Sequence, residues 1–169
     1  MDFRPAPSRG VAIGLGLLAV AIAACALLGL ALGAIGSGPR AAVVLAGLLV
    51  AVPLTLRLAY WVWGLVGLRY VLGRDGLVIR WAATRQVIPM SAITHVLAGR
   101  AYDGPLAGMR WPGHEVGRTT LRDDDGATRD ALVYATAPPE GQLVVLTPSL
   151  AYAISPADPQ AFVEDFRMR

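Results

Sequence analysis

The sequence predicts a mainly β protein of the α+β class, in which an N-terminal transmembrane helical hairpin precedes an antiparallel β-barrel or sandwich with a C-terminal capping helix. Three observations predict this fold. Residues 11–36 carry no charged side chain and residues 41–63 carry one. From residue 68 onward, short apolar runs alternate with polar residues and are separated by turn sequences. Residues 155–169 have the capping residues and apolar spacing of one amphipathic helix.

The two long apolar runs form the predicted membrane hairpin, residues 11–67, which follows a tail of residues 1–10. Each run exceeds the roughly twenty helical residues that cross a bilayer, and residues 36–40 between them are rich in Gly and Pro and predict a turn. Pro53 lies inside the second run. Neighbouring helices in membrane proteins satisfy the backbone groups that such a proline frees, so the run is still predicted to span.

The end of the second run has the composition of a membrane–water interface. An arginine there is long enough to reach the headgroups, and amphipathic aromatic rings favour the same level. The predicted interface anchors are Arg57, Tyr60, Trp61 and Trp63.

Cys25, the single cysteine, excludes an intramolecular disulfide and any Cys-pair metal site. Residues 22–25 resemble a lipoprotein processing site, and a cleaved signal peptide is a second alternative for the first run. The run is longer than the about 7–15 residues of a signal-peptide core, and it stays apolar beyond Cys25, where lipoproteins turn polar. We therefore interpret it as an uncleaved helix and leave lipidation of Cys25 open.

Small residues recur every four positions on the first run, at Ala21, Cys25, Gly29 and Gly33. Such a stripe permits close packing of membrane helices. Three interpretations stay open: packing within the hairpin, self-association with the helix of another chain, and chance in a sequence rich in Ala and Gly.

The arginines predict the orientation of the hairpin. All fifteen basic residues are arginines, and they flank the hairpin on both sides, whereas the loop between the runs has only Arg40. Positive charge stays in the cytoplasm, so both termini are predicted to be cytoplasmic in a multi-pass protein of a bacterial cytoplasmic membrane. The wealth of Ala, Gly and Arg is typical of a bacterial coding sequence.

Residues 68–169 are predicted to form the water-soluble domain. An Asp-Gly pair at 75–76 predicts a tight hairpin after the first strand, Ser91 is expected to cap a helical turn, and Asp158 or Ser155 to cap the final helix. The predicted strands are residues 68–73, 77–81, 85–89, 93–100, 116–122, 129–136, 142–147 and 151–154.

Residues 101–115 contain two Pro and three Gly and are predicted to be a long loop. Loops of this length are usually functional. Because Met109 and Trp111 are large side chains in this loop, we expect them to be exposed and to contact a partner or the membrane.

Residues 69–81, 87–93 and 152–162 together resemble the bacterial pleckstrin-homology (PH) domains, most specifically in the segments IPMSAI and ISPADPQAF. The resemblance covers about residues 68–169 and the preceding hairpin, since these domains commonly follow a pair of transmembrane helices. It implies a PH-like barrel or sandwich at a membrane. It implies no activity, since many members of the family have none established.

Four arginines on the first hairpins are candidate contacts for lipid or another anion: Arg69, Arg74, Arg80 and Arg85. Eukaryotic PH domains bind phosphoinositide headgroups with basic residues at a similar place, and arginine suits bidentate phosphate contact. Residues 68–122 carry a net charge of +5 and residues 123–169 a net charge of −5. Specific headgroup binding, general attraction to anionic lipid and an ordinary solvated face remain as alternatives.

Few residues have the pattern of a catalytic or metal site. His95 is expected to be half-buried in a strand, His114 beside Glu115 is a weak acid–base pair, and the acids at 123–125 lack the spacing of a calcium loop. The domain is neutral overall, which argues against nucleic-acid binding. We therefore expect a scaffold or interaction module without cofactor or enzymatic activity, which contacts membrane lipids and a protein partner; sensing of anionic lipid or a small ligand is the alternative.

Overall fold

A computed structural model describes residues 1–99, 102–122 and 128–168. The chain divides into two compact units, one formed by residues 1–10 together with 67–169 and the other by residues 11–66. The first unit is a β-rich domain and the second is a helical hairpin. The two are described separately.

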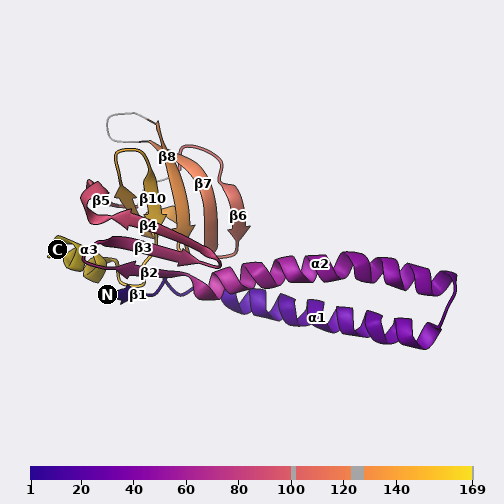
Figure 1. Cartoon of the computed structure of the whole chain (residues 1–169). Coiled ribbons are helices and arrows are strands. Elements are labelled where there is room, and N and C mark those ends of the chain that lie inside the picture. Colours follow the sequence, from indigo (N-terminus) through magenta and orange to yellow (C-terminus); the bar gives the residue numbers. More distant parts are fainter. Residues whose placement is uncertain (100–101, 123–127, 169) are drawn as a thin grey trace. The chain divides into compact units, whose positions relative to one another are not determined.

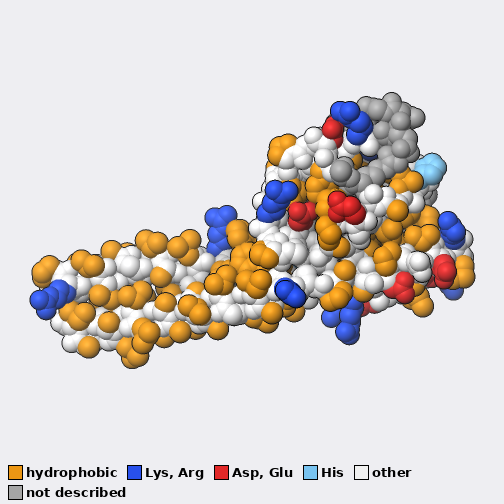
Figure 2. Space-filling view, turned by 180° about the vertical axis from the view of Figure 1, so that it is seen from behind, with side chains coloured by type: hydrophobic (Ala, Val, Ile, Leu, Met, Phe, Trp, Pro, Cys, Tyr) orange, Lys and Arg blue, Asp and Glu red, His pale blue; other side chains and the backbone are white. Residues whose placement is uncertain are grey.

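The hairpin consists of α1 (Gly10–Ile35) and α2 (Pro39–Gly67), and both helices are long enough and apolar enough to cross a membrane. Hydrophobic side chains cover their surfaces (Figure 2). Helix α2 continues through Pro53 and ends at Gly67, four residues beyond the predicted end of the span. The proline is tolerated, as expected for a membrane helix.

The two helices pack along a seam with heptad spacing. Half-buried positions follow one another by three or four residues on each helix, the spacing of a left-handed antiparallel pair. At its centre Cys25 Sγ lies 3.4 Å from Thr55 Oγ1, and the same hydroxyl donates to the carbonyl of Ala51 at 2.8 Å. The seam includes Leu18, Ala21, Cys25, Leu28 and Leu32 of α1 and Val44, Leu48, Ala51, Thr55 and Leu58 of α2.

This seam corrects one interpretation of the small-residue stripe. Ala21 and Cys25 lie on the seam, but Gly29 and Gly33 are exposed, and a Cβ atom at either glycine would meet nothing within 4 Å. The cause is periodicity, because a spacing of exclusively four residues drifts off a seam whose average spacing is 3.5. Gly29 and Gly33 therefore take no part in packing within the hairpin.

The domain contains two sheets whose strands run crosswise in Figure 1. The four-stranded sheet has the order β1-β2-β3-β4 and the six-stranded sheet the order β5-β9-β10-β8-β7-β6. The strands are β1 (Asp2–Phe3), β2 (Arg69–Leu72), β3 (Gly76–Trp81), β4 (Thr84–Pro89), β5 (His95–Ala98), β6 (Ala107–Trp111), β7 (His114–Arg122), β8 (Thr128–Ala135), β9 (Leu143–Leu146) and β10 (Ala151–Ile154).

One apolar core lies between the sheets because apolar side chains alternate along the strands. Helix α3 (Pro159–Arg167) packs Phe162 into this core, and the carboxylate of Asp158 accepts a hydrogen bond from the Ala161 amide at 2.9 Å, which confirms the predicted cap. Tyr70 is fully buried and donates to the Tyr134 carbonyl at 2.6 Å; burial raises the pKa of its hydroxyl to about 12.

Of the two predicted architectures, the sandwich is confirmed: across the described residues the sheets are open and form no closed barrel. Other predictions about the domain are wrong. The strands are not all antiparallel, because β10 pairs with β8 in parallel. Residues 101–115 are not one long loop, because β6 forms within them and β7 begins at His114. Ser91 lies inside the 3₁₀ turn Met90–Ala92, which has no side-chain cap. Ala101 and the acids at 123–125 lie outside the described residues.

The N-terminal residues belong to the domain, which the sequence did not indicate. Strand β1 pairs with β2, the Met1 amino group donates to the Leu72 carbonyl at 2.6 Å, and the ring of Phe3 packs edge-on against Phe162 at 5.2 Å. Further along, the Ala6 carbonyl accepts a hydrogen bond from the Thr136 hydroxyl at 2.7 Å. The segment before α1 and the chain after α2 therefore form one folded unit.

Candidate functional site

Three of the four candidate arginines form one row across the four-stranded sheet. In the register of the strands, Arg69 of β2 is directly opposite Arg80 of β3, and Arg80 is directly opposite Arg85 of β4. The neighbours of these arginines along the strands, such as Tyr70 and Ile79, point into the core. Because side chains alternate, the arginines point away from it, and all three are exposed.

The arginine row concentrates positive charge. Side chains directly opposite on neighbouring strands have Cβ atoms about 5 Å apart, and like charges at that spacing destabilise a sheet. Asp2 relieves part of this repulsion, since its carboxylate lies 3.2 Å from the guanidinium of Arg69. Within the described part of the chain, no carboxylate forms an ion pair with Arg80 or Arg85. The row therefore presents uncompensated charge to an anion from outside.

A second row on the same face is apolar. Val71 is opposite Val78, and Val78 is opposite Val87, two residues along each strand from the arginines. Val87 is 56% exposed, and Val71 and Val78 are half-buried. We call these two rows together the arginine–valine face. The alternation of side chains along the strands could have predicted that these valines share a face with the arginines. Nothing in the sequence indicated the two-residue strand β1, which places Asp2 beside Arg69.

Arg74 does not join the row. It lies in the turn between β2 and β3, beyond Leu72, at the opposite end of the hairpin from Arg69. With a strand rise of about 3.3 Å per residue, its backbone is more than 10 Å from the row. The structure thus brings together three of the four predicted arginines and separates the fourth.

Met109 and Trp111, which were predicted to be exposed in a long loop, are neither exposed nor in a loop. Met109 lies in β6 and is buried, at 8% exposure, so it offers little surface to a partner. Trp111 is half-buried, and its indole Nε1 donates to the Gly10 carbonyl at 2.9 Å. A Cβ atom at Gly10 would lie 2.3 Å from the Pro112 carbonyl oxygen, so the turn after β6 fits closely against the residue at which α1 begins.

The histidines also differ from expectation. His95 is exposed rather than half-buried. His114 is 1% exposed, and within the described residues neither ring nitrogen has a hydrogen-bond partner; burial lowers its pKa to about 4. Glu115 instead accepts a hydrogen bond from Tyr102 at 3.1 Å and pairs with Arg110 at 3.5 Å. The described residues contain no cluster of three or more His, Cys, Asp or Glu side chains that could hold a metal.

The predicted interface anchors lie near the C-terminal end of α2 and contact one another. The Arg57 guanidinium lies 5.1 Å from the centre of the Trp61 ring, a cation–π geometry, and the rings of Tyr60 and Trp63 meet edge-on at 6.1 Å. The side chains of Tyr60 and Trp63 are exposed, at 40% and 55%. This arrangement is typical of an aromatic belt, and its depth in a membrane stays a prediction.

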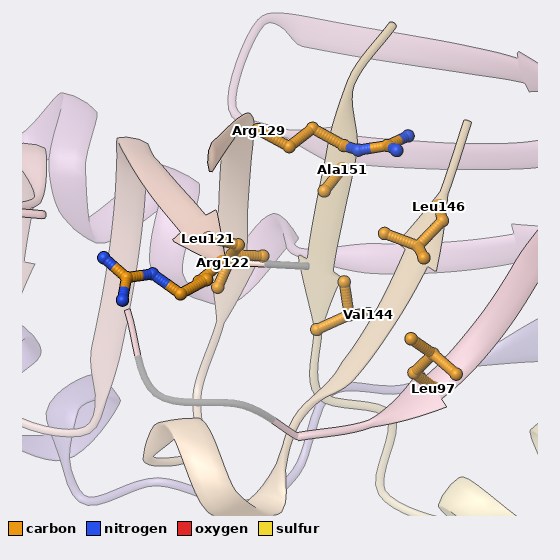
Figure 3. Close-up of a pocket in the computed structure, with 7 residues that line it drawn as sticks. All are labelled: Leu97, Leu121, Arg122, Arg129, Val144, Leu146 and Ala151. Atoms are coloured by element: carbon orange, nitrogen blue, oxygen red, sulfur yellow. The ribbon is translucent and has the colours of Figure 1, made fainter. Parts of the chain in front are cut away.

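A small apolar hollow lies on the six-stranded sheet (Figure 3). Two arginines flank it, but Arg129 donates to the Thr147 carbonyl at 2.6 Å, and Arg122 pairs with Asp103 at 3.2 Å. Both guanidinium groups are therefore engaged within the protein. The hollow is lined by Leu97, Leu121, Arg122, Arg129, Val144, Leu146 and Ala151.

The comparisons with known proteins agree with this fold. A family model described as a bacterial PH domain matches residues 68–169, and the chain belongs to this family. The matched domain is preceded by two apolar helices that are long enough to span a membrane. No match was found among curated proteins or among solved structures.

Proposed function

We propose that this chain is a membrane-anchored PH-domain protein that presents its domain at the cytoplasmic face of a bacterial membrane as a non-catalytic scaffold or interaction module. One observation carries the proposal: residues 1–10 and residues 67–169 fold into a single unit. With two membrane-spanning helices between these segments, both must be on the same side of the membrane. The flanking arginines then favour the cytoplasmic side.

The interface anchors support the same arrangement. Trp61 and Trp63 precede the first strand after α2 by only a few residues. An aromatic belt at this level fixes the end of the second span at the bilayer surface, and the domain follows without a linker. A protein partner that binds the domain is thereby recruited to the membrane surface, which is the effect of a scaffold.

Reporter fusions test the topology. A reporter that is active only outside the membrane is expected to be inactive when fused to either end of the full-length chain and active when inserted after Ser37, in the loop between the helices. Activity at either end would overturn the cytoplasmic assignment. A reporter that is active only in the cytoplasm provides the matched control for expression.

Crosslinking in intact cells tests the scaffold role. The full-length chain is expected to crosslink to a protein partner that a chain ending at Gly67 does not capture, because the domain makes the contact. If both chains capture the same proteins, the interaction belongs to the hairpin and the scaffold proposal fails.

A second candidate function is recognition of anionic lipid headgroups or a small anionic ligand. The observation that favours it is the register of Arg69, Arg80 and Arg85, which places three guanidinium groups side by side. Arginine binds phosphate strongly through paired hydrogen bonds. This function is compatible with a scaffold role, because contact with lipid would fix the orientation in which the domain meets a partner.

A further inference from the structure

We infer that the arginine–valine face lies flat against the bilayer that anchors the protein and binds several anionic phospholipids at once, selecting them by charge and not by headgroup structure. This inference rests on the proposed function, because it requires the domain to be held at a membrane surface.

The charge of the face determines the class of ligand. Arg80 and Arg85 have no carboxylate partner among the described residues, and the pairing of Arg69 with Asp2 is half-exposed on both sides. Repulsion within the row is relieved when phosphate groups lie between the guanidinium groups. Anionic phospholipid supplies such groups at high density, and each basic residue close to an anionic surface strengthens binding by about fivefold.

The geometry of the face determines the manner of binding. Side chains on one face of a sheet stand roughly perpendicular to it, so the three arginines project side by side and do not converge on one point. Strands are spaced by about 4.8 Å, so the row spans about 10 Å, which exceeds the width of a single phosphate. A surface of several headgroups fits this row better than one headgroup in a pocket.

The valine row lies on the same face. Val71, Val78 and Val87 lie about 7 Å along the strands from the arginines, since two residues separate the rows. Val87 is 56% exposed on this face, so a group attached at this position reports the approach of the face to the bilayer.

The attachment of the sheet to α2 makes this contact accessible. Arg69 follows Gly67, the last residue of α2, with only Leu68 between them. Two residues span at most about 7 Å, so the first arginine of the row is close to the end of the helix. A charged group about one Debye length from an anionic surface still experiences its potential.

Full-length protein in lipid nanodiscs tests the inference. In a Cys25→Ala background, Val87→Cys receives a fluorophore, and Glu140→Cys, at an exposed turn before β9, receives it as the control. The discs contain lipids with a headgroup quencher in phosphatidylcholine, with or without phosphatidylglycerol. We expect strong quenching at position 87 only in discs with phosphatidylglycerol, its loss at high salt, and little quenching at position 140 in either disc.

Arginine variants test which charges are responsible. Arg80→Gln with Arg85→Gln is expected to abolish the quenching at position 87. Arg118→Gln with Arg167→Gln removes the same net charge at exposed sites on β7 and α3 and is expected to retain it. Equal quenching with and without phosphatidylglycerol, or equal loss in both double variants, would overturn the inference.

The selection by charge has its own test. Phosphatidylglycerol and phosphatidylserine at equal surface charge are expected to give equal quenching, and soluble inositol phosphate at micromolar concentration is expected not to reverse it. A preference for one headgroup, or reversal by the soluble phosphate, would show a specific pocket and overturn the inference of a flat contact. If the reporter fusions place both ends in the cytoplasm while these tests fail, the inference fails and the proposed function stands.

Discussion

The indole nitrogen of Trp111 donates a hydrogen bond to the carbonyl of Gly10 at 2.9 Å, which joins the turn after β6 to the first residue of α1 across 101 positions of sequence. Both residues belong to the compact unit formed by residues 1–10 and 67–169, so this hydrogen bond joins the segment before α1 to the β-rich domain.

Replacing Trp111 with Phe tests the contact between the turn and Gly10. The ring is retained but the donor is lost, and we expect the free energy of unfolding of the full-length protein to fall by about 1 kcal/mol. Chemical denaturation in detergent, followed by the fluorescence of the remaining tryptophans, measures the change. An unchanged midpoint would show that the hydrogen bond contributes nothing.

Alanine substitutions at two glycines test how closely the turn fits. At Gly10 a Cβ atom would lie 2.3 Å from the Pro112 carbonyl oxygen and 2.9 Å from Trp111 Cδ1, so Gly10→Ala is expected to displace the turn and lower stability by about 1–3 kcal/mol. At Gly67 nothing lies within 4 Å, so Gly67→Ala is the matched control and is expected to be neutral or slightly stabilising. Equal thermal midpoints for the two variants would contradict the close fit.

His114 predicts a dependence of stability on pH. Burial lowers the pKa of His114 from 6.5 to about 4, so the unfolded chain binds a proton first as the pH falls. Above about pH 6.5 the buried neutral His114 costs the folded state nothing relative to the unfolded chain. As the pH falls from about 6.5 to about 4, the free energy of unfolding decreases progressively, by a total on the order of 3 kcal/mol. His114→Phe is expected to remove this part of the pH dependence, measured by denaturation at pH 7 and at pH 4.5.

His95 provides the control for the pH experiment because it is exposed. His95→Phe is expected to leave the difference in stability between the two pH values unchanged. If His114→Phe and the parent protein lose stability equally on acidification, the burial of His114 is not the cause.

The exposed glycines of α1 test self-association of the hairpin. Gly29→Ile places its side chain where nothing lies within 4 Å, so the hairpin itself is expected to stay folded. Cys25→Ile places a similar side chain on the seam, against Thr55, and is expected to disturb the hairpin. If chains pair through Gly29 and Gly33, Gly29→Ile is the only one of the two variants that lowers the dimer fraction in detergent while the helix content stays intact. An unchanged dimer fraction for Gly29→Ile would exclude self-association through the face of α1 that carries these glycines.

Much of the fold follows from local patterns in the sequence. The membrane-length helices, the strand at Ala151–Ile154 and the Asp158 cap were predictable because each depends on composition, alternation or capping within a few residues. The arginines were found for the same reason. Their assembly into one row depends on the register of β2, β3 and β4, which brings together residues of three different strands.

The missed features depend on contacts between distant residues. Strand β1 has two residues, and its pairing with β2 across almost seventy positions has no local signal. Strand β6 forms within a segment rich in Gly and Pro because β7 is available as a partner, and tertiary pairing outweighs its weak local propensity. The parallel pairing of β8 and β10 also arises only from the packing of the whole sheet.

The effect of Arg80→Gln on thermal stability in two kinds of nanodisc tests the role of the arginine row most directly. In phosphatidylcholine discs the substitution removes repulsion within the row, so the account predicts a higher midpoint than for the parent protein. In discs rich in phosphatidylglycerol it removes a bound phosphate contact, so the account predicts a lower midpoint. A shift of the same sign and size in both discs would contradict the account.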